Sequence, residues 1–166
     1  MEQKITPFLW FDKNCEEAIN FYVETFNNNP AKKSESKVVS VKRYPEGPLP
    51  PPMSGMEGKV LTAVFELNGQ RFIALDGGPI FKPSNATSFY IECDGQEEVD
   101  YFWGKLTEGG DPKNQQCGWL QDKYGFSWQV IPKQLPEALN NSDLAKAAKS
   151  LQAMMKMKKI VIADLG

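Results

Sequence analysis

Apolar residues follow helix and strand periods in alternating blocks along the chain. Residues 15–26 carry apolar side chains with the spacing of a helix that buries one face, at Ala18, Ile19, Tyr22, Val23 and Phe26. The same spacing predicts helices over residues 96–106 and 142–156. Short runs rich in β-branched and aromatic residues predict strands at residues 5–11, 37–44, 59–67, 70–75, 87–93, 118–121 and 126–131.

Turn-forming residues separate these elements. Asn68-Gly69 lies between two predicted strands and is a strong signal for a hairpin. Residues 45–58 contain five prolines and three glycines. Because proline has a fixed φ and no backbone N–H, this segment predicts a long mobile loop and excludes a helix or a central strand.

The pattern of strand, helix and further strands occurs twice. An offset of 81 residues superimposes four identical pairs, Phe8 on Phe89, Glu16 on Glu97, Glu17 on Glu98 and Phe21 on Phe102. Residues 69–75 also align with residues 125–131, with Phe72 on Trp128. The sequence therefore predicts a duplicated module in which a strand and a helix are followed by two or three strands.

Composition and charge narrow the class of protein. The 166 residues carry a net charge of −2, so the chain lacks the basic excess of most nucleic-acid-binding proteins. No apolar run approaches the length of a transmembrane helix, and the polar opening residues argue against a signal peptide. Three cysteines without a Cys-x-x-Cys pair suggest free thiols in a reducing compartment. We therefore expect a cytoplasmic protein that binds neither nucleic acid nor membranes.

The chain contains no histidine. This absence excludes Ser-His-Asp and Cys-His nucleophile pairs, and it removes the ligand found in most zinc and non-haem iron sites. Any acid–base chemistry would depend on glutamate, aspartate, tyrosine, cysteine or lysine.

Five segments of the chain have distinctive sequences, namely PFLWFDKNCEEAINFY, FELNGQRFIALDGGPIF, SFYIECDGQEEVDYFW, QCGWLQDKYGFSWQVIP and AMMKMKKIVIADL. They resemble the PhnB-like family, often described as a 3-demethylubiquinone-9 3-methyltransferase domain, of the vicinal oxygen chelate superfamily. The resemblance implies an α+β fold in which two βαβββ modules form a half-open, barrel-like sheet, as in glyoxalase and bleomycin resistance proteins. It places the modules at residues 1–80 and 81–135 of one structural domain, followed by a C-terminal helical tail over 136–166. It also implies a homodimer.

The superfamily holds a divalent cation with four strand residues, usually histidine or glutamate. The resemblance places these positions at Thr6, Ile73, Ser88 and Gln129. Because none of the four carries a charge, we expect no metal site and no cofactor. The sequence does not support the methyltransferase activity in the family's name either. A cofactor-binding glycine turn should lead into a helix, but Gly77-Gly78 is followed by Pro79.

Strand alternation places Phe8 and Trp10 on one face of the first strand. By the resemblance this face lines the concave side of the sheet, and Tyr90 and Glu92 match it in the second module. Trp10 could be a ligand-stacking wall or simple core, and Glu92 an acid–base group or a rim carboxylate paired with a lysine or arginine.

Three further residues are left with two interpretations each. Gln129 could hydrogen-bond a ligand or only satisfy neighbouring groups, and Trp119 could be a pocket wall or a dimer contact. Cys117 could be a reactive thiol or a buried, inert one.

Two hypotheses of function follow. In the first, the chain is a glyoxalase/bleomycin-resistance-like protein that binds a small molecule in an aromatic-lined pocket without a metal. Its ligand-binding residues would be Phe8, Trp10, Tyr90, Glu92, Trp119 and Gln129. In the alternative, it is a metal-independent or unusually metallated enzyme of the same superfamily, with Glu92, Tyr90 or Cys117 as candidate acid–base groups. The sequence assigns no catalytic residue.

Overall fold

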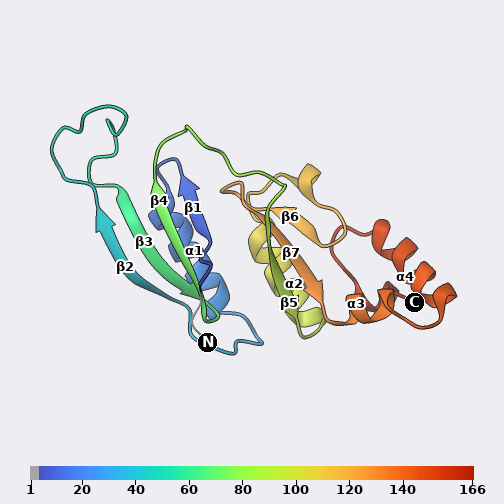
Figure 1. The fold of residues 1–166 in the computed structure, drawn as a ribbon. Helices are drawn as coiled ribbons and strands as arrows, with labels where there is room; N and C mark the ends of the chain where they lie inside the picture. The colour runs from blue at the N-terminus through green and yellow to red at the C-terminus, as the bar shows by residue number, and fades with distance from the viewer. Residues whose placement is uncertain (1–3) are drawn as a thin grey trace. The chain divides into compact units, whose positions relative to one another are not determined.

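A computed structural model describes residues 4–166 of the chain. The chain divides into two compact units (Figure 1). The first comprises residues up to 28 together with 32–83, and the second comprises residues 29–31 and 84–166. None of the helices in residues 4–166 is long and apolar enough to span a lipid bilayer.

The first unit is a four-stranded sheet with one helix. Its elements are β1 (Phe8–Phe11), α1 (Cys15–Asn27), β2 (Lys37–Arg43), β3 (Val60–Leu67) and β4 (Gln70–Asp76). The sheet has the order β1-β4-β3-β2, in which only β1 and β4 are parallel. β1 begins three residues later than predicted, and the Pro7 carbonyl accepts a hydrogen bond from the Ile73 amide just before the strand starts (2.9 Å).

Alternation along the strands separates a helix-covered face from an open face. Leu9 and Phe11 of β1 are buried, and so are Ile19 and Tyr22 of α1. The predicted two-residue period and the predicted apolar helix face are therefore both confirmed.

Asp76, at the end of β4, joins three elements of the first unit. Its side chain is only 1% exposed. Oδ1 accepts a hydrogen bond from the Cys15 amide at the start of α1 (2.9 Å), and Oδ2 accepts one from the Val60 amide at the start of β3 (3.0 Å). The carboxylate thus supplies partners for two backbone donors, one of them at a helix N-terminus where the helix itself offers none.

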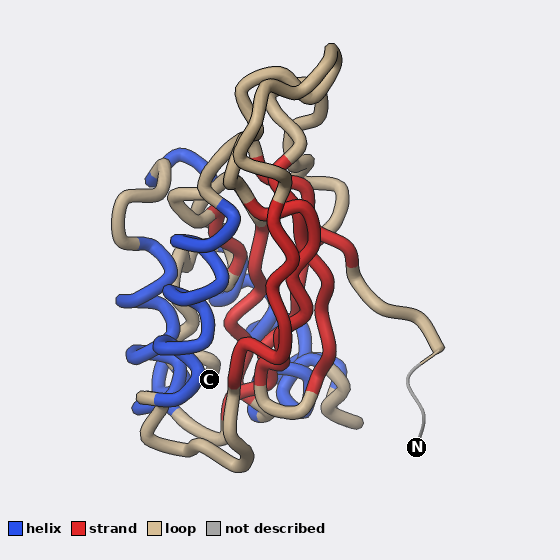
Figure 2. Tube along the Cα trace, turned by 90° about the vertical axis from the view of Figure 1, so that its left-hand side faces the viewer, coloured by secondary structure: helices blue, strands red, loops and turns tan. Residues whose placement is uncertain are grey.

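The long loop between β2 and β3 contains no helix or strand, as its prolines predicted (Figures 1 and 2). It still has internal structure. Glu57 Oε1 accepts hydrogen bonds from the amides of Leu49 (3.2 Å) and Gly55 (3.3 Å), and Met56 is buried.

The second unit has a three-stranded sheet. Its elements are β5 (Ser88–Cys93), α2 (Gln96–Thr107), β6 (Trp119–Gln121) and β7 (Ser127–Pro132), and the strand order is β5-β7-β6. β5 is parallel to β7, just as β1 is parallel to β4. Trp128 is buried on the helix side, and its Nε1 donates to Asp122 Oδ2 (2.8 Å) in the turn before β7.

The second module differs from the predicted βαβββ pattern because the described chain forms only two strands after α2. The segment between α2 and β6 contains instead a 3-10 turn, η1 (Pro112–Asn114). Pro112 cannot donate a ladder hydrogen bond, and the Asp111 side chain caps the turn by accepting from the Lys113 amide (2.9 Å).

The structure also corrects the repeat offset of 81. Phe8 is 53% exposed and matches Tyr90, also 53% exposed, at an offset of 82. By contrast Phe89 packs against Trp128, with ring centroids 5.0 Å apart. The buried helix pairs match at an offset of 80, namely Ala18 with Glu98, Ile19 with Val99 and Tyr22 with Phe102. The offset of 81 is therefore an average of two different correspondences.

The C-terminal segment of the second unit contains α3 (Gln134–Leu139), α4 (Leu144–Met155) and the 3-10 turn η2 (Ile162–Asp164). Only α4 was predicted. A core cluster of Ile131, Leu135, Ile160 and Leu165 holds the segment. The backbone adds two hydrogen bonds, from the Cys117 amide to the Met157 carbonyl (2.9 Å) and from the Gly118 amide to the Lys158 carbonyl (2.7 Å).

Candidate functional site

The open face of the second sheet carries an aromatic and amide row. In the strand register Tyr90 of β5 lies opposite Gln129 of β7, and Gln129 lies opposite Trp119 of β6. Residues directly opposite each other in a sheet share a face, so the three side chains are neighbours. Tyr90 is 53% and Trp119 36% exposed, so both rings are accessible from solvent.

One hydrogen bond orients the side-chain amide of Gln129. Its Nε2 donates to Ser88 Oγ (2.9 Å), which orients the amide on the sheet. No donor within residues 4–166 contacts its Oε1. The arrangement therefore presents a positioned hydrogen-bond acceptor between two aromatic side chains.

Glu92 lies on the same strand as Tyr90, two residues further on. Its side chain is exposed, and its Oε1 lies 3.9 Å from Lys133 Nζ. Lys133 also forms an ion pair with Asp94. This geometry favours the rim ion pair over the acid–base role. The pKa of Tyr90 is raised, first by partial desolvation and then by the negative charge of Glu92, so its phenol stays protonated at neutral pH.

The open face of the first sheet is more apolar. Phe8 is exposed there, with Ile73 of β4 directly opposite. Trp10 is half-buried, its Nε1 donates to the Gly78 carbonyl (2.9 Å), and its ring meets Phe81 edge-on with centroids 5.0 Å apart. The Trp10 ring is thus held in place by the Gly78 carbonyl and by Phe81.

The four positions at which the sequence resemblance predicts metal ligands do not suit a divalent cation. Phe8 with Ile73 and Tyr90 with Gln129 are equivalent pairs, so the open faces carry Ile73 in one unit and Ser88 and Gln129 in the other, while Thr6 lies two residues before β1 begins. Ile73 offers no donor atom, and the Gln129 amide is bonded to Ser88. No group of three histidine, cysteine, aspartate or glutamate side chains with metal-binding geometry occurs in the part of the chain that the structure describes. Neutral hydroxyl and amide oxygens are weak ligands on their own.

The glycine pair after β4 does not fit a methyl-donor cofactor either. Residues 77–87 continue from β4 to β5 without a helix, so no helix N-terminus receives a phosphate or carboxylate there. Gly77 serves another purpose, because a Cβ at this position would lie 2.2 Å from the Trp10 ring.

The three cysteines differ in burial. Cys15 and Cys93 are fully buried, and burial raises both thiol pKa values to about 12. Cys117 is half-buried at the start of the β6 hairpin, with φ of 52°. The distinct environments separate two protected thiols from one partly accessible thiol.

We expect a thiol reagent such as DTNB to modify one cysteine rapidly in the native protein and all three in denaturant. A Cys117→Ser variant should lose the fast phase. Rapid native labelling of two or three thiols would contradict this assignment.

The two buried thiols also make stability depend on pH. Because their folded pKa values exceed the unfolded value of about 8.5, their contribution to stability is present below that pH and declines as the pH rises above it.

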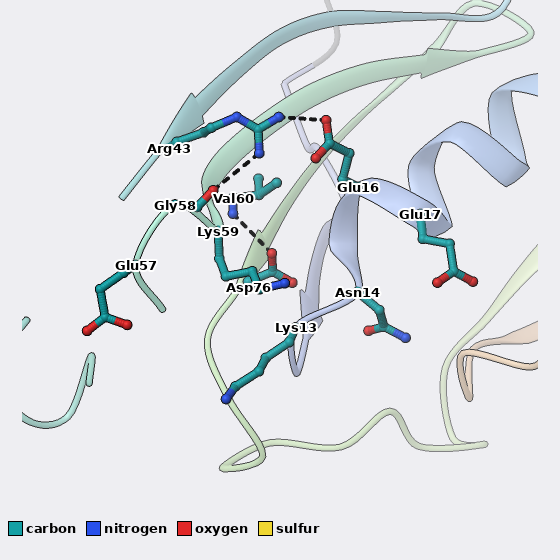
Figure 3. Close-up of a pocket in the computed structure, with 10 residues that line it drawn as sticks. All are labelled: Lys13, Asn14, Glu16, Glu17, Arg43, Glu57, Gly58, Lys59, Val60 and Asp76. Atoms are coloured by element: carbon teal, nitrogen blue, oxygen red, sulfur yellow. Dashed lines mark hydrogen bonds and ion pairs between the residues drawn. The ribbon is translucent and has the colours of Figure 1, made fainter. Parts of the chain in front are cut away.

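A polar pocket of about 390 Å³ lies in the first unit, and no motif in the sequence pointed to it. It surrounds the start of α1 and is lined by Lys13, Asn14, Glu16, Glu17, Arg43, Glu57, Gly58, Lys59, Val60 and Asp76 (Figure 3). These residues come from four separate segments and share no spacing. Only the fold brings them together.

Comparison with known proteins identifies the family. A family model described as 3-demethylubiquinone-9 3-methyltransferase matches residues 3–131. A PhnB protein of Bacillus cereus, provisionally named 3-demethylubiquinone-9 3-methyltransferase, is 39% identical, with a TM-score of 0.64 over 78% of this chain and 99% of its own.

Two solved structures of lower sequence identity also match the chain. A Pseudomonas aeruginosa protein is 20% identical, with a TM-score of 0.60 over 79% of this chain and 98% of its own. FosX, the fosfomycin resistance protein of Listeria monocytogenes, is 14% identical, with a TM-score of 0.47 over 82% and 98%. No curated protein matches the chain significantly. The match over residues 3–131 and the 39% identity to the Bacillus cereus protein show that this chain belongs to the PhnB-like, 3-demethylubiquinone-9 3-methyltransferase family.

Proposed function

We propose that this chain binds a small, partly planar organic molecule on the open face of its second sheet, without a metal or a methyl-donor cofactor. The observation that carries the proposal is the Gln129 amide, which is oriented by Ser88 and has a free Oε1 between Tyr90 and Trp119. Such an acceptor favours a ligand that donates an N–H or O–H group.

The side chains around Gln129 support binding more than catalysis. Aromatic rings supply contact area, and one positioned polar group supplies orientation, which is the usual composition of a small-molecule site. Glu92 is exposed and lies near Lys133, so it is poorly placed to exchange a proton with a buried substrate. On the first unit, Phe8 and Trp10 offer an aromatic surface of their own, which we propose as a separate ligand contact.

Replacing Gln129 with leucine should weaken binding of such a ligand about tenfold, because a hydrogen bond in a partly buried site is worth roughly 1 kcal/mol or more. Candidate ligands would be found by a thermal-shift screen of planar amides, phenols and heteroaromatic compounds. Their dissociation constants would then be measured by calorimetry on wild type and variant. Tyr90→Ala should weaken the same ligands by removing ring contact.

Gln152→Leu is the matched control, since Gln152 is exposed and belongs to α4 and not to a strand of this sheet. It should bind as wild type does. Unchanged affinity in both Gln129→Leu and Tyr90→Ala would refute the site. Conversion of a bound compound to a new product by the wild-type protein would replace the binding function with an enzymatic one.

A further inference from the structure

A second polar row lies next to the aromatic and amide row on the open face of the second sheet. In the strand register Ser127 of β7 lies opposite Ser88 of β5 and opposite Gln121 of β6. Residues two apart in a strand point to the same side of the sheet, so both rows share one face. Ser127 is nevertheless only 4% exposed. Its burial shows that other side chains cover it on this otherwise open face.

Asn85, in the segment before β5, is one of the residues that cover Ser127. Its Oδ1 accepts hydrogen bonds from Ser127 Oγ (3.0 Å) and from Gln121 Nε2 (3.1 Å). The Asn85 side chain is therefore held at two points, although the residue as a whole is exposed to solvent. The hydrogen bond to Asn85 also satisfies the buried hydroxyl of Ser127.

A backbone carbonyl determines the orientation of the Asn85 amide. Gln121 Nε2 also donates to the Gly125 carbonyl (2.9 Å), while Gln121 Oε1 accepts from Asn114 Nδ2 (2.7 Å). Because a carbonyl can only accept, it fixes which end of the Gln121 amide is the donor. That donor faces the Asn85 oxygen, so Nδ2 is the outward end of Asn85. No acceptor within residues 4–166 is hydrogen-bonded to Asn85 Nδ2.

Two oriented amides thus present opposite polarities on one sheet face. Gln129 is bonded to Ser88 and offers its Oε1 as an acceptor, while Asn85 is bonded to Ser127 and offers its Nδ2 as a donor. Ser88 and Ser127 lie directly opposite each other on neighbouring strands, which are about 4.8 Å apart. One small molecule can therefore reach both amides.

We propose that the ligand of this face carries a carbonyl acceptor and an N–H donor on one planar edge, as a cyclic amide does. This inference rests on the binding site proposed above and names the chemistry of its ligand. Asn85 Nδ2 donates to the ligand carbonyl, and Gln129 Oε1 accepts from the ligand N–H. The rings of Tyr90 and Trp119 contact the planar body of the ligand. A molecule without one of the two polar groups leaves one protein amide unpaired and binds more weakly.

The test compares three flat bicyclic compounds by NMR titration of the full-length protein. Quinolin-2-one carries both polar groups, 1-methylquinolin-2-one lacks the N–H donor, and indole lacks the carbonyl acceptor. We expect quinolin-2-one to bind about five- to tenfold more tightly than either of the others, since each of those loses one hydrogen bond.

Asn85→Asp tests the donor directly. The aspartate keeps the oxygen that accepts from Ser127 and Gln121, but it replaces the outward amide group with a second oxygen. The variant should lose the preference for quinolin-2-one over indole, and Gln129→Leu should lose the preference for quinolin-2-one over 1-methylquinolin-2-one. Asn140→Asp adds the same charge at an exposed position at the end of α3 and is the matched control, which should keep both preferences. Melting temperatures would verify that each variant is folded.

Equal affinity of the wild-type protein for quinolin-2-one and indole would overturn the inference, and so would an Asn85→Asp variant that keeps the preference. If Tyr90→Ala and Gln129→Leu still weakened binding in those cases, the sheet-face site would stand and only the ligand class would be wrong. Binding that neither variant weakens would refute the site itself. Absence of quinolin-2-one binding at millimolar concentration would overturn the ligand class, while the thermal-shift screen would still test the site with other compounds.

Discussion

Replacing Asp76 with alanine should lower the free energy of unfolding by about 3 kcal/mol. The carboxylate is buried and is the hydrogen-bond partner of the Cys15 and Val60 amides. Its removal leaves two buried N–H groups without a partner, and each such group costs roughly 1–3 kcal/mol. Chemical denaturation followed by circular dichroism would measure the change.

Two further variants control this result. Asp12→Ala removes an exposed aspartate three residues before Cys15 and should change stability by less than about 0.5 kcal/mol. Asp76→Asn keeps one acceptor oxygen and should lie between wild type and Asp76→Ala. A loss below about 1 kcal/mol for Asp76→Ala would show that the two amides find other partners.

Replacing Gly77 with alanine should cost about 2 kcal/mol. The new Cβ would lie 2.2–2.5 Å from three atoms of the Trp10 indole, which is well inside van der Waals contact. The ring cannot move away easily, because it donates to the Gly78 carbonyl and contacts Phe81. We therefore expect a loss of stability together with a displaced Trp10 ring.

The indole N–H signal of Trp10 in an NMR spectrum would report the displacement, with a Trp10→Phe variant used to assign it. Gly47→Ala is the matched control in the same unit, since a Cβ there meets nothing within 4 Å. An unchanged indole signal and unchanged stability in Gly77→Ala would mean that the backbone adjusts without disturbing Trp10.

Local periodicity was sufficient to predict most elements of both units. Apolar spacing identified α1 and α2, and alternation identified the buried and open faces of β1. The offset of 81 was misleading because the strands correspond at an offset of 82 and the buried helix positions at 80. The loop between strand and helix accounts for one residue of this difference, since it has three residues in the first unit, after Phe11, and two in the second, after Cys93. Identical residues such as Phe8 and Phe89 therefore face different layers, and only burial reveals the true pairs.

The C-terminal helix shows a different limit of sequence patterns. Its apolar spacing predicted a packed face, yet Leu144 is 81% and Met155 61% exposed, while Ser150 is the buried residue. The Ser150 hydroxyl has a hydrogen-bond partner within the helix, because its Oγ donates to the Lys146 carbonyl (3.1 Å). An apolar face predicts which side of a helix could be buried, but it does not predict whether another element packs against that side.

Site residues on regular strands were easier to predict than those of the polar pocket. Tyr90, Gln129 and Trp119 lie in strands whose alternation places them on one face. Lys13 and Lys59 precede α1 and β3, and their proximity depends on how the loops close. No periodicity or residue spacing in the sequence predicts that these two lysines lie close together.

The hydrogen bonds from Cys117 and Gly118 to the carbonyls of Met157 and Lys158 have a consequence for self-association. An exposed strand edge is a template on which another chain can add a strand and begin to aggregate. Here the returning C-terminal segment already uses the amides at the entrance to β6, an edge strand of its sheet. A second molecule would have to displace this segment, and its anchors Ile160 and Leu165, before it could extend the sheet at that point. The segment therefore blocks the addition of a strand from a second molecule at the start of β6.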